Sequence, residues 1–388
     1  MERPRTGIFS LVVAFGWFSL YAYLPILPAY ARELGASYEM VGFIIGGYGF
    51  TQMVLRLPLG ILSDACRKRK LFVIAGMALC LVSGAGMLLF PTVLSLLVFR
   101  ALAGVAATTW VVQTVLYASY FPATASAKAL GRITAVCTAG QMVATLIGGF
   151  IAYRWGEPYT FLLAAVGGAA ALLFSFSITE NCPAERQPAQ FMDIIRIGKN
   201  HALVSASVLA LVLQIVTHGT AYGFIPIAGK NLGANSFQMG LLPTLFMVPG
   251  VLASMTSGTF FARRFGQKAS IVMGYFMLAA PVLAVPFITD LNMLYLTQII
   301  SGFGRGLAFP LLMQHSVAHI EAHQKATAMG YFQSIYGIGM VLGPVILGIL
   351  GDRMGLGWGF WAIGCIGLLG TAAAAFWLSS ARKIAQTA

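Results

Sequence analysis

Twelve apolar stretches, each long enough to cross a lipid bilayer as a helix, dominate the chain. A transmembrane helix needs about 20 mostly apolar residues. Because an open strand in lipid would leave backbone N–H and C=O groups unpaired, we expect every stretch to be helical. The chain is therefore predicted to be an all-α integral membrane protein. The expected spans are approximately 8–30, 40–62, 71–90, 93–118, 131–153, 158–178, 203–228, 238–261, 269–288, 292–316, 327–350 and 358–379.

The composition supports a bilayer rather than a soluble environment. Hydrophobic residues make up 59% of the 388 residues and charged residues 9%, whereas soluble domains have about 45–50% and about 25%. The net charge of +13 does not indicate nucleic acid binding, because the bases lie in short gaps between apolar spans and not on one soluble face. We expect them to contact an anionic cytoplasmic lipid surface.

The cysteines and the N-terminus indicate neither a cofactor nor a cleaved leader. The five cysteines are scattered without C-x-x-C spacing, so neither a disulfide framework nor a zinc site is expected. No phosphate-binding G-x-x-x-x-G-K-[ST] motif occurs. The apolar run that ends near Tyr30 is too long for an ordinary signal core, and we interpret it as the first transmembrane helix.

The distribution of basic residues predicts the orientation. If the N-terminus is cytoplasmic, 17 of the 24 Lys and Arg residues fall on the cytoplasmic side and four in outside loops, while Arg56, Arg100 and Arg305 lie within spans. Cytoplasmic loops of membrane proteins carry an excess of Lys and Arg. We therefore expect a plasma membrane protein, in a bacterial inner membrane, with both termini cytoplasmic.

The chain is expected to consist of two repeated six-helix halves. The longest polar interval, 180–201, falls near the middle, so the predicted organisation is 1–180, a cytoplasmic linker at 181–201, and 202–388. "LGAS" at 34 and "LGAN" at 232 are 198 positions apart, as are Gly42 and Gly240. We also expect Arg100 and Arg305 to correspond, at an offset of 205. Parallel repeats of this kind predict a central cavity between the halves.

Four short sequence motifs lie within or between the predicted spans. "GILSDACRKRK" at 60–70 joins the second and third spans, and "FRALAG" at 99–104 lies in the fourth. "GQMVATLIGG" at 140–149 lies in the fifth span, and a similar "GMVLGPVILG" at 339–348 lies in the eleventh. With these motifs and twelve spans, the whole chain resembles the major facilitator superfamily. It is most similar to the twelve-helix drug and metabolite exporters of that superfamily.

The resemblance implies a secondary active transporter that works by alternating access. In the family, the segment between helices 2 and 3 latches the two halves on the cytoplasmic side. By resemblance, that gating role falls on Gly60, Asp64, Lys68 and Arg69. The carboxylate of Asp64 is suited to pairing with bases or with a helix N-terminus at the membrane edge. The alternative is that the bases only anchor this loop at the cytoplasmic surface.

Charges inside the spans indicate either a binding site or a brace. A charged residue at the centre of a span costs about 2.5–3.5 kcal/mol on insertion scales, and it persists where it faces a cavity or a partner. Arg100 and Arg305 are therefore candidates to attract an anionic group of a substrate. Both alternatively could hydrogen-bond carbonyls of neighbouring helices. Arg56 lies one turn before Gly60, so we expect its side chain to extend toward the cytoplasmic interface.

No carboxylate lies deep within a predicted span. Of the 11 acidic residues, six fall on the cytoplasmic side and five outside. Their positions argue against a cationic substrate. They also leave proton coupling without a carboxylate inside a span, which is the usual proton carrier. His218 is the candidate for a proton-binding group, because histidine titrates near neutral pH. The alternative is a polar histidine that only packs in the core. His315, His319 and His323 share one helix face, but we expect a solvated helix end there and no metal.

Polar and aromatic residues within the spans complete the predicted substrate site. Amide and hydroxyl groups suit a polar organic solute, although some of them are expected only to pack between helices. With Arg100, Arg305 and His218, the predicted substrate-binding residues are Tyr48, Gln52, Trp110, Gln113, Gln214, Tyr222, Gln333 and Tyr336. Tyr21, Gln141 and Gln298 are further candidates.

The function that these features favour is transport of a small organic solute, anionic or zwitterionic, by proton-coupled export. Uptake or facilitated diffusion of an organic anion is the alternative within transport. A membrane enzyme is disfavoured, because the spans contain no paired carboxylates, G-x-S-x-G or metal cluster. A transport-inactive membrane sensor is a further alternative. We expect a monomer without cofactors, with the proton as the coupling ion.

Overall fold

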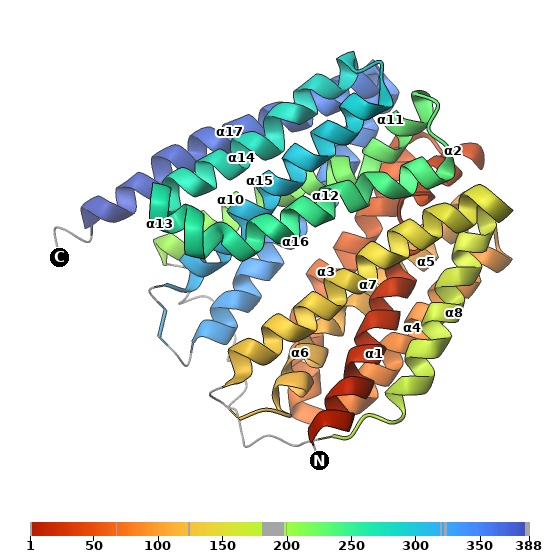
Figure 1. Cartoon of the computed structure of the whole chain (residues 1–388), viewed down its shortest axis with the longest axis horizontal. Coiled ribbons are helices and arrows are strands. Elements are labelled where there is room, and N and C mark those ends of the chain that lie inside the picture. Colours follow the sequence, from red (N-terminus) through yellow and green to blue (C-terminus); the bar gives the residue numbers. More distant parts are fainter. Residues whose placement is uncertain are drawn as a thin grey trace. The chain divides into compact units, whose positions relative to one another are not determined.

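The computed structural model contains helices and their connections (Figure 1). It describes residues 2–66, 68–122, 125–180, 198, 200–318, 320–321 and 324–384. The first six spans are formed by α1 (Glu2–Tyr21) with α2 (Leu27–Glu33), α3 (Tyr38–Cys66), α4 (Arg69–Leu89), α5 (Val93–Thr108) with α6 (Trp110–Ala118), α7 (Ser126–Trp155) and α8 (Pro158–Ser175).

The second six spans follow the same pattern. They are α10 (His201–Gly219) with η2 (Thr220–Phe224) and α11 (Ile225–Asn231), α12 (Ser236–Thr256) with η3 (Ser257–Phe261) and α13 (Ala262–Phe265), α14 (Gln267–Ala284) with η4 (Val285–Phe287), α15 (Leu291–Val317), α16 (Lys325–Met354) and α17 (Leu356–Ile384).

The helices confirm the predicted all-α membrane fold. In the described part of the chain, nine helices are long and apolar enough to cross a membrane. Thr6–Tyr21 is a shorter apolar helix, and α3 and α15, with 29 and 27 residues, complete the twelve predicted positions. Most of the predicted linker, at 181–197 and 199, lies outside the described residues.

The first and seventh spans are interrupted at positions 198 residues apart. The first is broken by turns at residues 22–26, between α1 and α2, and the seventh changes to the π-helix η2 at Thr220–Phe224. Both α2 and α11 carry a proline in their first turn, Pro28 and Pro226. Proline removes a backbone N–H and clashes with the preceding turn. The repeated proline thus accounts for the repeated interruption.

The described chain forms two compact units. The described residues of the first unit fall within 1–35, 47–188 and 235–241, and those of the second fall within 36–46, 189–234 and 242–388. The first part of α3 thus belongs to the second unit and its remainder to the first. The predicted boundaries at 180 and 202 remain a prediction.

Helices in the first unit pack closely through small residues. In it, α1 packs against α7 and α8, and α4 against α5 and α8. A Cβ placed on Gly168 of α8 would lie 2.5 Å from the backbone nitrogen of Leu81, and one on Gly84 of α4 would lie 2.6 Å from that of Ala165. Membrane helices lack a hydrophobic drive toward one another, so they associate through such close contacts.

The second unit repeats this arrangement. There, α10 packs against α15, α16 and α17, and α14 packs against α15 and α17. Figure 1 shows α14 and α17 running side by side. The contact of α14 with α15 again uses glycines, because a Cβ on Gly274 would lie 2.7 Å from the carbonyl oxygen of Gly304.

The glycine contacts correct one predicted correspondence. Gly104 lies against the backbone of Tyr48, and Gly302 lies against the backbone of Phe246. Both members of this second pair follow the first by 198 positions. At that offset Arg100 corresponds to Gln298, so the expected equivalence of Arg100 and Arg305 is wrong. The helix contacts contain no insertion, and Arg305 lies seven residues further along its helix, about 10 Å at 1.5 Å per residue.

Replacing Gly168 by alanine is expected to destabilise the protein by about 1–3 kcal/mol, because the new methyl group would overlap the backbone of α4. The matched control is Gly131→Ala in α7, where nothing lies within 4 Å of the added Cβ. There the better helix propensity of alanine should leave stability unchanged or raised by up to about 1 kcal/mol. Thermal unfolding in detergent measures both, and equal midpoints would refute the close α4–α8 contact.

Candidate functional site

Arg100 of α5 makes its contacts within its own unit, although its buried Nε has no hydrogen-bond partner among the described residues. It is 3% exposed, and its Nη1 donates to the carbonyl oxygen of Leu20 at 3.3 Å and to the Tyr23 hydroxyl at 3.1 Å. Its guanidinium carbon lies 4.1 Å from the centre of the Tyr48 ring. A desolvated cation over an aromatic face gains about 2 kcal/mol. These contacts join α1, α3 and α5, so Arg100 braces the bundle.

The interruption of the first span supplies the partners of Arg100. At the end of α1, the Leu24 N–H donates to the Tyr21 carbonyl at 3.1 Å and not to Leu20. The Leu20 carbonyl, left without its helical partner, accepts from Arg100 instead. The residue pattern did not single out Tyr23 or Leu20. The signal was the pair of prolines in "YLPILP", which frees backbone carbonyls at this depth.

A polar row on α3 continues from Tyr48. Gln52 is buried one turn later and donates to the Tyr48 carbonyl at 3.4 Å. Arg56 follows after a further turn and donates from Nη2 to the Gln52 oxygen at 2.6 Å. Arg56 is half-buried. Its contact with Gln52 means that it belongs to this row.

Trp110 and Gln113 lie on α6. The Trp110 ring meets Trp17 of α1 edge-on at 5.5 Å, and Trp17 also lies 6.1 Å from Tyr21. Gln113 donates to the Thr109 hydroxyl at 2.9 Å, while its buried oxygen accepts no hydrogen bond within the described residues. A buried acceptor without a donor is costly. This oxygen is therefore available for a ligand donor.

Arg305 of α15 has an environment unlike that of Arg100. It is the fifteenth of the 27 residues of its helix and is half-buried. Its guanidinium lies 5.5 Å from the centre of the Phe309 ring, one turn later. Within the part of the chain that the structure describes, no hydrogen bond or ion pair engages it, and its Nε is buried. Arg305 is thus an uncommitted cation near the middle of a span.

Aromatic rings surround this cation on one side. Phe309 lies 5.8 Å from Tyr336 and 6.2 Å from Phe332, both on α16. Tyr336 and Gln333 are half-buried on the same helix. The predicted residues Arg305 and Tyr336 are therefore brought together through Phe309, which residue patterns did not identify because phenylalanine is common throughout the spans.

Gln214, His218 and Tyr222 form a buried row along α10 and η2. The His218 and Tyr222 rings meet at 5.3 Å, and Tyr222 meets Phe246 of α12 at 5.7 Å. The oxygen of Gln214 is buried and accepts no hydrogen bond from the described residues. Short π-helical segments inside helices occur frequently at functional sites. The row ends within such a segment, which supports a role beyond packing.

Two further candidates, Gln298 and Gln141, hydrogen-bond to residues of their own helices. Gln298 is buried and donates to the adjacent Thr297 hydroxyl at 3.1 Å. Gln141 is half-buried and donates to the Cys137 sulfur at 3.4 Å. No group of three potential metal ligands occurs among the described residues. His319 and His323 lie outside them.

The predicted gating segment is described only in part. Gly60 lies in α3, and a Cβ there would meet Val111 at an ordinary 3.8 Å. Lys68 is exposed just before α4, and Arg69 is half-buried in its first turn. The side chain of Asp64 and the whole of Arg67 lie outside the described residues. Lys70 donates from Nζ to the Phe176 carbonyl at 2.7 Å, so this base holds the ends of α4 and α8 together.

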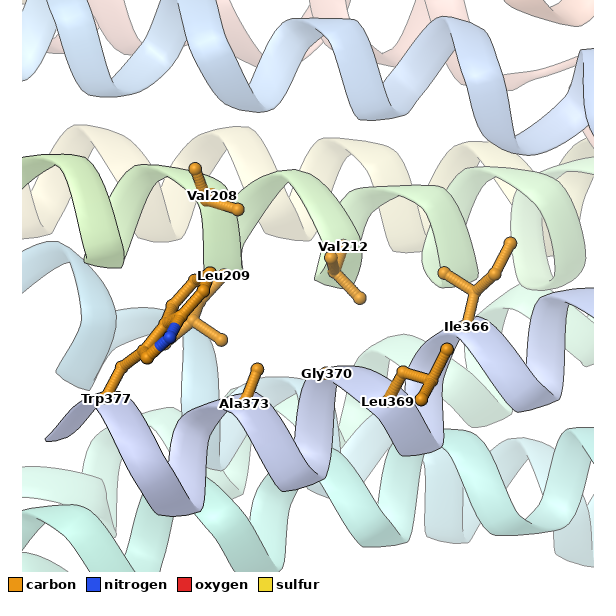
Figure 2. Close-up of a pocket in the computed structure, with 8 residues that line it drawn as sticks. All are labelled: Val208, Leu209, Val212, Ile366, Leu369, Gly370, Ala373 and Trp377. Atoms are coloured by element: carbon orange, nitrogen blue, oxygen red, sulfur yellow. The ribbon is translucent and has the colours of Figure 1, made fainter. Parts of the chain in front are cut away.

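A groove of about 240 Å³ lies between α10 and α17 (Figure 2). Its lining residues are apolar, including Leu209, Ile366, Leu369 and Trp377. Polar solutes require polar groups in fixed positions. The groove therefore does not suit a polar solute.

Comparison with known proteins identifies the fold family. The model of the Major Facilitator Superfamily matches residues 9–219 and again 207–387. An uncharacterized MFS-type transporter of Methanocaldococcus jannaschii is 24% identical over 341 residues, which cover 86% of this chain and 87% of that protein. A homolog of the multi-drug resistance efflux pump PmrA from Lactococcus lactis is 25% identical over 335 residues, covering 83% and 82%.

A solved structure agrees with this result. The bacterial homolog of the human lysosomal transporter Spinster, in an inward-facing and unoccupied conformation, superposes with a TM-score of 0.80 at 14% identity. The match covers 97% of this chain and 96% of that one. The two matches of the family model, the apolar helices of the described residues and the superposed fold together lead to one conclusion: the chain belongs to the major facilitator superfamily of membrane transporters.

Proposed function

We propose that this secondary transporter moves a small organic solute with an anionic group, and that Arg305 binds that group. The uncommitted guanidinium of Arg305 is the observation that carries the proposal. A cation near the centre of a span persists where it faces a cavity or a partner. Its planar fork of donors suits a carboxylate or phosphate. Arg100 serves a different purpose in this proposal, because its Nη1 already donates to the Leu20 carbonyl and to the Tyr23 hydroxyl.

The positions of the acids support an anionic or zwitterionic substrate. Each Asp and Glu whose side chain is described lies at a helix end or in a loop: Glu33, Glu39, Glu157, Glu180, Asp290, Glu321 and Asp352. A cationic solute would therefore meet no carboxylate from these residues within the spans. The buried oxygens of Gln113 and Gln214 are the acceptors that we assign to substrate N–H or O–H groups.

We further propose proton-coupled export. His218 is our candidate proton carrier, because it is the buried titratable imidazole of the described spans and contacts Tyr222 of the π-helix η2. The name of the Lactococcus relative, an efflux pump, supports the outward direction.

The remaining predicted residues take two roles in this proposal. The first group would shape the substrate site, and the second would form the cytoplasmic gate of a monomer. The site-shaping residues are Gln52, Trp110, Gln333 and Tyr336. The gating residues are Gly60, Asp64, Lys68 and Arg69.

The test compares metabolites inside and outside cells that express the wild type, Arg305→Gln, His218→Gln or Asp64→Asn. We expect an anionic compound to accumulate outside only with the wild type, and a protonophore to abolish this. Loss of a charged hydrogen bond of about 1.5–3 kcal/mol corresponds to a transport loss of about 10-fold or more in Arg305→Gln. Asp290→Asn, which alters an exposed carboxylate, is the control.

Three results would contradict the proposal. Accumulation inside the cell would reverse the direction. Transport that persists with the protonophore would remove the proton coupling. An anionic compound exported normally by Arg305→Gln would exclude Arg305 as the anion-binding group.

We also propose that both termini are cytoplasmic. The excess of bases in the segments on that side supports this orientation. A reporter that is active only in the cytoplasm, fused to the C-terminus, should be active, and a reporter that needs export should be inactive there. The same pair of reporters inserted at Gly35 should give the opposite result. Activity of the exported reporter at the C-terminus would refute the orientation.

A further inference from the structure

Asp352, near the end of α16, bonds to the first turn of a different helix, α3. Its Oδ1 accepts from the Tyr38 N–H at 2.9 Å, and its Oδ2 accepts from the Glu39 N–H at 2.7 Å. The next two N–H groups of α3 bond to Ser37, that of Met40 to its hydroxyl and that of Val41 to its carbonyl. The first four donors of the helix are thus satisfied, and two of them depend on Asp352.

Glycines bring the two helices into backbone contact at the same place. A Cβ on Gly42 of α3 would lie 2.5 Å from the Pro344 carbonyl oxygen. Gly348 of α16 lies against the Tyr38 carbonyl, and a Cβ on Gly351 would lie 3.3 Å from the Tyr38 Cβ. All of these residues belong to the second unit. The carboxylate therefore lies at the end of a close helix crossing and not on an isolated surface.

The first unit contains the corresponding crossing, between α7 and α12, without such a carboxylate. A Cβ on Gly240 would lie 2.7 Å from the Thr145 carbonyl oxygen, and one on Gly149 would lie 3.0 Å from that of Ser236. These contacts match those of α3 with α16 at offsets of 198 and 199. The start of α12 is capped locally by Asn235 and Gln238, which bond to each other's N–H groups at 2.9 Å.

The residue at the position of Asp352 in this second crossing is Tyr153, 199 positions earlier. The capping carboxylate thus distinguishes the α3–α16 crossing from its counterpart. Aspartate is favourable at a helix N-terminus, because the first N–H groups and the helix dipole both attract an anion. A cap taken from another helix ties the two helices together as well.

We propose that Asp352 is a positioning residue of the transport cycle, whose carboxylate latches the first turn of α3 to the end of α16 and releases it in each cycle. Residues 38–46 of α3 belong to one unit and the remainder of α3 to the other. A movement of one unit against the other must therefore bend α3 or separate its first turn from α16. Asp352 is exposed, and a helix cap contributes little enough to stability that it can open and close reversibly.

This inference rests on transport by the family to which the chain belongs, and not on the substrate proposed above. Its test accordingly needs no substrate. Gly351→Cys and Tyr38→Cys would place two Cβ atoms 3.3 Å apart, close to the separation of about 3.5–4.5 Å found in disulfides. The pair is introduced into a chain whose five native cysteines are replaced, with a protease site in the 181–199 segment.

The measurement is the rate of disulfide formation in membranes, read after cleavage as the fraction of halves that stay linked. Asp352→Ala removes both acceptors, and Asp352→Asn keeps one acceptor without the charge. Asp290→Ala is the matched control. Asp290 is also an exposed carboxylate that caps a helix, but it bonds at 3.1 Å to Asn292 of its own α15.

We expect Asp352→Ala to slow disulfide formation by about three- to tenfold, in keeping with the loss of a helix cap. Asp352→Asn should give an intermediate rate, and Asp290→Ala should stay within about twofold of the parent. An unchanged rate in Asp352→Ala would overturn the latch. An equal slowing in Asp290→Ala would overturn it as well, because the effect would then be general helix destabilisation.

Discussion

A guanidinium inside a hydrocarbon layer must be surrounded by dipoles, aromatic faces or an opposite charge, and the rest of the structure depends on how this requirement is met. Arg100 meets it within its own unit, through the Leu20 carbonyl, the Tyr23 hydroxyl and the Tyr48 ring. Arg305 has only the Phe309 ring among the described residues. One arginine therefore stabilises the helix bundle, and the other is the one that we propose to bind a substrate.

The interruptions of the first and seventh spans connect this requirement to the repeat. A proline in the first turn after each interruption removes a backbone donor. Backbone carbonyls and side chains near each interruption can therefore bond to groups outside their own helix. In the first half the offered carbonyl binds Arg100. In the second half the π-helix orders Tyr222 against His218 and Phe246. Broken spans at corresponding positions of two repeats are a general mark of transporter binding sites.

The apolar runs were sufficient to predict the helical spans, because span length follows directly from bilayer thickness. The offset of 198 residues between the two repeats was also predictable from matching glycines, because few other residues fit where two helix backbones lie in close contact. The matching of Arg100 with Arg305 failed because it compared residue types, whereas the contacts of Gly104 and Gly302 define the correspondence. The cap by Asp352 was not foreseen, because an acid at a loop gives no sign of a partner 314 residues away.

We propose that Arg305 binds an anion and that Arg100 instead holds the helices of its unit together. Thermal unfolding of the purified protein, measured with a panel of small carboxylates and amines of similar size, tests it most directly. We predict that some carboxylates raise the unfolding temperature of the wild type and of Arg100→Gln, but not of Arg305→Gln. Without ligand, Arg100→Gln should unfold at a lower temperature than Arg305→Gln. Stabilisation by amines, or carboxylate stabilisation that survives in Arg305→Gln, would contradict the claim.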